Sequence, residues 1–392
     1  MLSRRIQALS PSLTIAISTL AKEMKAEGKD VISFSAGEPD FDTPRKIKDA
    51  AIKAIDEGFT KYTAVPGIPE LLEAISYKLE KENNLKYAPN EIIVSNGAKQ
   101  SLFNLFQAVI DEGDEVIIPA PYWVTYPEIV IYSGGKPVII ETNEKNRFKM
   151  SAKELQAAIT PKTKMVVLTS PSNPTGSIYT RDELIEIARV LEGTDILVAS
   201  DEMYEKLIYE EGFTSTASIS EDMFQRTITI NGLSKSVAMT GWRFGYLATP
   251  KKELISAMNK LQSQSTSNIN SITQKAAIIA LRGEVDDEIE SMRKAFETRA
   301  SEAVKLFNEI DGLSVLAPKG AFYLFVNIKE VSNDSIEFCK QLLKETGVAV
   351  VPGVGFGSEG YFRFSFATDI DTIREGIGRI KRFVEKDSLS LR

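Results

Sequence analysis

Two cationic side chains lie eight residues apart in the stretch from Gly232 to Gly245, and both suit one kind of chemistry. Lys235 follows a short apolar run, residues 227–231, and Arg243 comes after a glycine-bounded turn. A lysine amine forms a Schiff base with an aldehyde when burial or a nearby cation lowers its pKa, and arginine is a preferred receptor for phosphate. Pyridoxal 5′-phosphate carries both groups, so the pair predicts a site for this cofactor. The alternative is a solvated lysine in a loop and an arginine at a helix end.

The absence of histidine narrows the acid–base chemistry that the chain can perform. It excludes Ser-His-Asp and Cys-His nucleophile systems and removes the commonest zinc ligand, so no metal site is expected. Proton transfer then falls to Lys, Asp, Glu or Tyr. Lysine suits a Schiff-base enzyme, because the amine that releases the substrate can also move its proton.

The composition indicates a globular protein of two domains: 392 residues, 43% hydrophobic and 26% charged. The net charge of −7, the lack of a long basic run and the lack of a long apolar stretch argue against nucleic acid and membranes as partners. The first residues lack the pattern of a secretory signal. One cysteine, Cys339, excludes an internal disulfide, and a cytoplasmic location is expected.

The middle of the chain alternates short apolar strands with helical patterns, which is typical of a parallel sheet covered by helices on both faces. In such sheets ligands gather at the carboxyl ends of the strands. Strands are predicted at 91–95, 165–170, 196–200 and 227–231, with helices at 99–110 and 182–191.

The two ends of the chain read differently from the middle. A helix at 12–27 and a strand at 31–35 are predicted to pack against the C-terminal region, which reads as a smaller α+β domain. In that region we expect a long charged helix after about residue 291, strands at 322–327, 348–351 and 361–366, and a helix at 336–345. The predicted division is 1–42 as the N-terminal arm and part of the small domain, 43–290 as the large cofactor-binding domain, and 291–392 as the C-terminal small domain.

Two predicted strands run directly into residues that could contact a cofactor. Gly97, Ala98 and Lys99 open a helix, whose free N–H groups and dipole favour an anion such as the cofactor phosphate, although many such turns bind nothing. Asp201 could keep a pyridine nitrogen protonated and so make the ring an electron sink, or it could merely cap a helix. Tyr204 could reach the phenolic oxygen of the same ring.

Three more residues stand out by their surroundings. Asn173 lies in the loop 170–176, where two prolines restrict the backbone and hold the amide in one orientation. Trp123 offers a flat face for a charged ring, or it is a core residue. Arg363 lies in the apolar strand 361–366, and a buried guanidinium requires a carboxylate, from an internal acid or from a ligand.

The chain as a whole resembles the class I aminotransferases of PLP-dependent fold type I, from Leu2 to about Val384. The motifs that carry the resemblance are the run 232–245 and the Pro-x-Asn-Pro-Thr-Gly loop 171–176. It is most similar to the bacterial and thermophilic branch of the aspartate aminotransferases. The resemblance implies an α/β fold with a mostly parallel seven-stranded sheet and a smaller α+β domain. It also implies transfer of the amino group of L-aspartate to 2-oxoglutarate by a ping-pong mechanism.

The resemblance assigns the cofactor contacts residue by residue. Lys235 would hold the aldehyde and transfer the proton, Asn173 and Tyr204 would bond the phenolic oxygen, and Trp123 would stack on the ring. Gly97, Ala98, Lys99 and Arg243 would hold the phosphate, with Asp201 at the ring nitrogen. Tyr62, in the Thr-Lys-Tyr run at 60–62, would reach the phosphate of the neighbouring subunit in a homodimer.

The resemblance also implies how an amino acid and a 2-oxo acid would bind. Arg363 would grip the α-carboxylate in a bidentate pair, and Gly37 would approach the same carboxylate by its backbone. Lys99 and Thr14 would recognise the side-chain carboxylate. Trp123 and Asn173 complete the predicted substrate-binding set.

Two positions depart from the common pattern of the relatives. Gly232 occupies a position where many relatives have a phosphate-binding serine, which leaves only Ser234 as a nearby hydroxyl. Ser10 occupies a position where relatives that transaminate prephenate tend to have lysine. The alternatives are an aminotransferase of broader or aromatic specificity and a PLP-dependent β-lyase. A PLP-sensing transcription regulator is a third, although no basic helix-turn-helix precedes Pro11.

Overall fold

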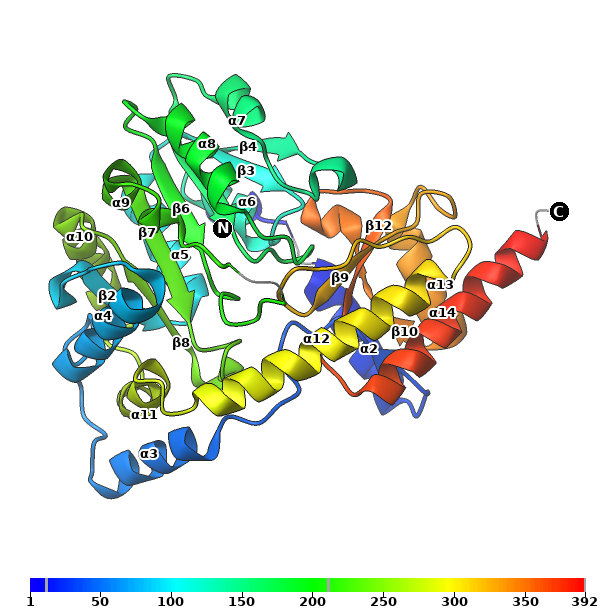
Figure 1. The fold of residues 1–392 in the computed structure, drawn as a ribbon, viewed down its shortest axis with the longest axis horizontal. Helices are drawn as coiled ribbons and strands as arrows, with labels where there is room; N and C mark the ends of the chain where they lie inside the picture. The colour runs from blue at the N-terminus through cyan, green and yellow to red at the C-terminus, as the bar shows by residue number, and fades with distance from the viewer. Residues whose placement is uncertain (11–12, 210–211, 391–392) are drawn as a thin grey trace.

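A seven-stranded sheet forms the centre of the computed structural model, which describes residues 1–10, 13–209 and 212–390 (Figure 1). The side chains of 13–15 and 387–390 lie outside the described part. The strand order is β2-β8-β7-β6-β5-β3-β4, and β8 alone among these strands runs antiparallel to its neighbours. The strands are β2 (Ile92–Asn96), β3 (Glu115–Ala120), β4 (Lys136–Glu141), β5 (Thr163–Thr169), β6 (Leu197–Asp201), β7 (Thr227–Gly232) and β8 (Phe244–Ala248). The predicted fold class is confirmed.

Helices cover both faces of this sheet because successive strand residues point to opposite sides. In β3, Val116 and Ile118 pack in the cluster that contains the apolar face of α5 (Ala98–Val109). Ile117 lies between them and packs with α8 (Arg181–Leu191) on the other face. Burial on both faces explains the nearly continuous apolar runs of the predicted strands.

The remaining helices connect the strands or cover the second, smaller part of the structure. They are α1 (Arg4–Gln7), α2 (Leu13–Ala26), α3 (Arg45–Asp56), α4 (Pro69–Asn83), α6 (Thr125–Tyr132), α7 (Ala152–Ala158), α9 (Glu221–Arg226), α10 (Lys252–Ser263), α11 (Ser271–Leu281), α12 (Asp286–Asn308), α13 (Ser335–Thr346) and α14 (Ile370–Ser390). The long charged helix α12 begins earlier than the predicted start near 291. Acidic residues at 286–288 form its first turn, where negative charge is favourable.

The smaller part contains two further sheets. One is antiparallel, in the order β11 (Val351–Pro352), β12 (Tyr361–Ser365), β9 (Tyr323–Asn327), and the other pairs β1 (Ile32–Ser33) with β10 (Val348–Ala349) in parallel. The prediction of one strand at 348–351 was therefore wrong. The chain changes partners after residue 349, so the two halves belong to different sheets.

The predicted strand at 31–35 is also shorter than expected, because Phe34 bridges two sheets. Its N–H donates to the Ala349 carbonyl at 2.8 Å, and its carbonyl accepts from the N–H of Ser365 at 2.9 Å. The N-terminal segment thus packs against the C-terminal region (Figure 1). Ile17 and Ala21 of α2 join Leu343 and Ala349 in one apolar cluster.

Candidate active site

A cavity of about 960 Å³ lies where the carboxyl ends of the central strands meet the N-terminal and C-terminal segments. It collects most of the predicted site residues from segments that are far apart in the sequence. Those that line it are Gly37, Gly97, Ala98, Lys99, Trp123, Asn173, Asp201, Tyr204, Lys235, Arg243 and Arg363. Tyr62 does not line it, and its side chain is 92% exposed. The side chain of Thr14 lies outside the described residues.

Lys235 projects into this cavity three residues after β7 ends at Gly232. Its Nζ donates a hydrogen bond to the Gly37 carbonyl. Burial lowers the pKa of Lys235 to about 8, and the nearby Arg363 cation contributes to the same shift. A solvated loop lysine would keep an ordinary pKa, so Lys235 is suited to act as a neutral amine.

The turn between β2 and α5 lies against Arg243. Gly97 has a φ of 81°, and a Cβ at this position would lie 2.6 Å from Nη2 of Arg243. Arg243 is held by hydrogen bonds to the carbonyls of Thr240 at 2.9 Å and Asn96 at 3.3 Å. The first N–H groups of α5 have no partner within the helix, so backbone donors and a guanidinium line the same cavity and together suit an anion.

The structure gives a reason for glycine at position 232. A Cβ there would lie 2.8 Å from the Phe244 carbonyl oxygen and 3.0 Å from Cε of Met203. A serine would therefore push β7 away from β8. The hydroxyl that remains on this side of the cavity is that of Ser234.

Asp201 is the last residue of β6, and Tyr126 holds its carboxylate. The Tyr126 hydroxyl donates to Oδ2 at 2.7 Å, and the Met203 N–H donates to Oδ1 at 3.2 Å. Burial raises the pKa of Asp201, while the bond from Tyr126 lowers it. Tyr126 was not predicted from the sequence. The signal that could have found it is its position three residues after Trp123, where the Tyr126 N–H donates to the Trp123 carbonyl at 3.1 Å and both side chains line the cavity.

Arg363 is buried without an anionic partner. It is 3% exposed, and among the described residues no Asp or Glu side chain pairs with it. Its Nη1 donates to Oδ1 of Asn173 at 3.0 Å, its Nη2 donates to the Ser35 carbonyl at 2.8 Å, and its Nε has no partner in the described part of the chain. None of the described Asp and Glu side chains is therefore the internal acid of the alternative, and a ligand carboxylate would complete the pairing of this arginine.

Aromatic rings enclose the same arginine. The Arg363 guanidinium lies 4.5 Å from the ring centre of Tyr323 and 5.0 Å from that of Phe356. The Tyr323 hydroxyl is 2.9 Å from that of Tyr204. Tyr323 was not predicted either, because only the pairing of β9 with β12 brings it beside Arg363.

Lys99 places a second cation on the wall of the cavity. Its Nζ lies 4.9 Å from the ring centre of Trp123, and Trp123 is partly exposed rather than enclosed in the core. Desolvation at the cavity wall lowers the pKa of Lys99, and Arg243 lowers it further. Lys99 and Arg363 are therefore two of the cations that line the cavity, besides Lys22, Lys25, Lys235 and Arg243, and a dicarboxylate requires two.

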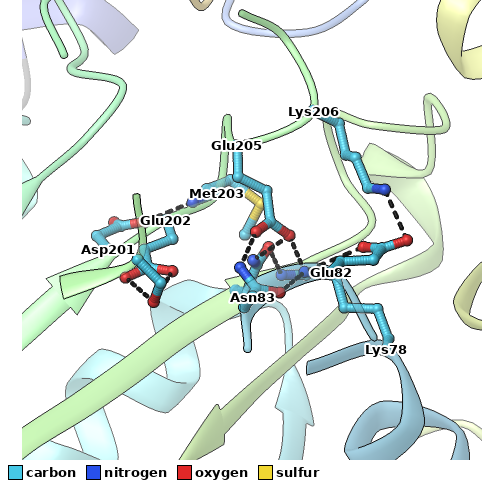
Figure 2. A network of polar contacts seen from close by, with 11 residues as sticks. Lys78, Glu82, Asn83, Asp201, Glu202, Met203, Glu205 and Lys206 are labelled. Atoms are coloured by element: carbon cyan, nitrogen blue, oxygen red, sulfur yellow. Dashed lines mark hydrogen bonds and ion pairs between the residues drawn. The ribbon is translucent and has the colours of Figure 1, made fainter. Parts of the chain in front are cut away.

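The segment that carries Asp201 and Tyr204 is also held by side chains that point away from the cavity, and Figure 2 shows their network of polar contacts. Glu202 and Glu205 do not line the cavity. The Glu205 carboxylate accepts hydrogen bonds from Lys78, from Nδ2 of Asn231 at 2.7 Å and from Nδ2 of Asn83 at 2.6 Å. Burial and the neighbouring Glu205 raise the pKa of Glu202 to about 7.

Asn231 connects this hydrogen-bond network to β7, the strand that leads to Lys235. It lies at the end of β7, and its Oδ1 accepts the N–H of Gly232 at 2.7 Å. The end of β6 and the end of β7 are therefore fixed to α4 and to each other.

Two other kinds of feature are absent from the described ranges. Within them no helix is long and apolar enough to cross a membrane. Nor do they contain a group of three or more His, Cys, Asp or Glu side chains placed to hold a metal ion.

The fold and the cavity define a class of enzyme in which a lysine at a strand end lies in one cavity with a buried arginine from the smaller part of the chain. The sequence matches the family of class I and II aminotransferases over residues 29–380. The chain belongs to this family, whose enzymes use pyridoxal 5′-phosphate.

Individual relatives match over nearly the full length. An aspartate aminotransferase of Bacillus subtilis is 51% identical over 393 residues, which cover 99% of this chain and 100% of that protein. An aspartate/prephenate aminotransferase of Nitrosomonas europaea is 49% identical, covering 97% of this chain and 98% of that protein. The structure of the Thermus thermophilus aspartate aminotransferase with maleate superimposes with a TM-score of 0.94 at 42% identity, covering 97% of this chain and 99% of that one.

Proposed function

We propose that this protein transfers the amino group of L-aspartate to 2-oxoglutarate, with pyridoxal 5′-phosphate held in the cavity. The observation that carries the proposal is Arg363, a buried cation with no carboxylate partner among the described residues, which faces the same cavity as the desolvated Lys235. Lys99 supplies a second cation for a second carboxylate. Support also comes from the aspartate aminotransferases that are similar over their full length and from the Thermus structure solved with maleate.

The residues of the cavity fit the proposed cofactor. The backbone N–H groups of Ala98 and Lys99, together with Arg243, suit its phosphate, whereas the Gly97 N–H already donates to the Ser95 carbonyl at 2.7 Å. The buried carboxylate of Asp201 suits its ring nitrogen. When bound, the cofactor supplies an electron sink that makes the substrate Cα–H acidic. The amide NH₂ of Asn173 is the donor left for the phenolic oxygen, because its amide oxygen accepts from Arg363.

Tyr204 can donate to the same phenolic oxygen if Tyr323 donates to Tyr204. The two hydroxyls are within hydrogen-bond distance, and either can be the donor. Burial raises the pKa of both phenols, so both keep their protons at neutral pH. One of the two hydroxyl protons therefore forms the hydrogen bond between Tyr323 and Tyr204, and the other can be donated to the phenolic oxygen.

The chain's own groups then act in order. Arg363 binds the substrate α-carboxylate in a bidentate pair and orients Cα toward Lys235. Once the substrate is bound, the Lys235 amine would be free to take a proton from the substrate Cα. Its low pKa lets it accept that proton near neutral pH, and Gly37 offers a carbonyl to hold the resulting ammonium. The same steps in reverse would transfer the amino group to the 2-oxo acid.

Homodimerisation with shared sites is part of the proposal. Tyr62 is 92% exposed and makes no side-chain hydrogen bond or ring contact with the residues that the structure describes, and Ile52 and Ile55 on α3 are also exposed. In a dimer Tyr62 would reach the phosphate of the neighbouring site. Mixed dimers of Tyr62→Ala and Lys235→Ala subunits test this, because one intact site per dimer forms only if Tyr62 acts across the interface. No regain of activity on mixing would contradict it.

Analysis of the products tests both which amino acid is the donor and which of its bonds is broken. With L-aspartate and 2-oxoglutarate we expect oxaloacetate and glutamate as products. Double-reciprocal plots of the initial rate should give parallel lines as the concentration of the second substrate is varied. Pyruvate with ammonia would instead support a β-lyase. Prephenate as an efficient acceptor would support the broader specificity that the name of the Nitrosomonas relative carries, although Ser10 provides no cation and its N–H donates to Glu128.

A further inference from the structure

Gln262 is a buried amide whose hydrogen-bonding capacity is completely used. It lies near the end of α10, which packs against α5 and β2, and it is 0% exposed. Its Oε1 accepts from Oγ of Ser95 at 3.0 Å and from Nδ2 of Asn104 at 3.0 Å. Its Nε2 donates to the Val94 carbonyl at 2.9 Å and to the Val65 carbonyl at 3.2 Å.

These partners belong to two segments that the proposed function places at a phosphate. Val94 and Ser95 are in β2, directly before the turn at Gly97, and Asn104 is in the helix that this turn opens. Val65 is in the loop that carries Tyr62. One side chain therefore joins the turn that faces the cavity of its own chain to the loop that would reach the neighbouring subunit.

The chemistry of the site requires an amide here. Two donors and two acceptors are satisfied at once, which no apolar or singly charged side chain of this length can do. Losing the amide would leave buried carbonyl and hydroxyl groups without partners, and such groups move to find new ones. Because phosphate is held by backbone N–H groups, small displacements of the turn would change their aim directly.

We propose that Gln262 is a positioning residue for the phosphate site, which fixes the Gly97 turn against the loop that carries Tyr62. Gln262 touches neither the cavity nor the reacting atoms. The proposal rests on the proposed function, in that it takes the Gly97 turn to be the phosphate site.

The experiment compares two probes that differ only in the phosphate. Apo-protein is titrated with pyridoxal 5′-phosphate and with pyridoxal, each followed by the absorbance of the Schiff base with Lys235, and inorganic phosphate is added as a competitor. In Gln262→Met we expect affinity for pyridoxal 5′-phosphate to fall about tenfold, roughly 1.4 kcal/mol, with affinity for pyridoxal unchanged. Competition by inorganic phosphate should weaken in parallel.

Matched variants separate positioning from general destabilisation. Met258→Ala changes an equally buried residue one turn earlier on α10, so it should lower thermal stability without changing the ratio of the two affinities. Gln262→Glu keeps both acceptors but loses the two donors, and should reduce the ratio as well. If Gln262→Met does not fold, Ser95→Ala removes one bond from the other side and should reduce the ratio by a smaller factor.

One result would overturn the proposal while leaving the proposed function intact: an unchanged ratio of the two affinities in Gln262→Met, whether both affinities stay the same or both fall equally. A wild-type protein that binds the two probes equally well would have a different consequence. It would overturn the assignment of the phosphate turn and with it the role of Gln262.

Discussion

The low pKa of Lys235 has a consequence that can be measured before any turnover. Burial is the largest cause of the shift and Arg363 the next, so Arg363→Met should raise the pKa of Lys235 only part of the way back to 10.5. Because the ordinary pKa is 10.5 and the site lowers it to about 8, the ammonium is disfavoured by about 3 kcal/mol.

The sign of the pH effect follows from which form reacts. Only the neutral amine attacks an aldehyde, so the rate rises with pH and levels off above the pKa. At pH 7 about a tenth of the amine would be neutral at a pKa of about 8, against roughly one part in 3,000 at 10.5. The site therefore accelerates the reaction at neutral pH by two to three orders of magnitude, through ionisation alone.

The assay mixes apo-protein with pyridoxal 5′-phosphate from about pH 6 to about pH 10 and follows the rate at which the Schiff-base absorbance appears. Lys235→Ala gives the baseline, and a blocked lysine in solution gives the unshifted profile. We expect a midpoint near 8 for the wild type and a higher one for Arg363→Met. A wild-type midpoint near that of free lysine would show that the site does not lower the pKa of Lys235.

Four further variants test other contacts of the site and of the network behind it. Arg363→Lys loses the planar fork, so kcat/KM should fall roughly 10- to 150-fold for dicarboxylate and monocarboxylate substrates alike, and a loss confined to aspartate would show that another cation binds the α-carboxylate. Tyr126→Phe removes the bond that lowers the pKa of Asp201, so the acid limb of the pH–rate profile should move to higher pH; an unchanged limb would contradict this role. Lys78→Met leaves the buried Glu205 carboxylate without its lysine partner. The free energy of unfolding, measured with denaturant, should fall by roughly 3–5 kcal/mol. The more exposed Lys206→Met should cost less than about 1 kcal/mol, and equal losses would argue against a buried pair.

The sequence predicted the parts of the site that depend on local order. Lys235, Asp201 and the Gly97 turn each follow an apolar strand directly, and parallel strands bring their carboxyl ends to one edge. Asn173 was predicted from its proline-rich loop and from a resemblance. These predictions needed no knowledge of which strands are neighbours.

The contacts that escaped prediction depend on the pairing of distant segments. Tyr323 meets Arg363 only because β9 pairs with β12, and Gln262 meets Ser95 only because α10 packs on β2. The need for glycine at 232 depends on the close approach of the Phe244 carbonyl in the next strand. The change of sheets after residue 349 likewise reflects competition between two partners for a continuous apolar run, which has no local signal.

The most direct test of the central claim is a single half-reaction. The protein loaded with pyridoxal 5′-phosphate is mixed with L-aspartate alone, and the absorbance of the Schiff base with Lys235 and the oxaloacetate formed are measured together. The account predicts loss of that absorbance with one oxaloacetate per site, its return on adding 2-oxoglutarate, and neither change in Lys235→Ala. Oxaloacetate formed without Lys235, or absorbance lost to aspartate with pyruvate and ammonia as products, would contradict it.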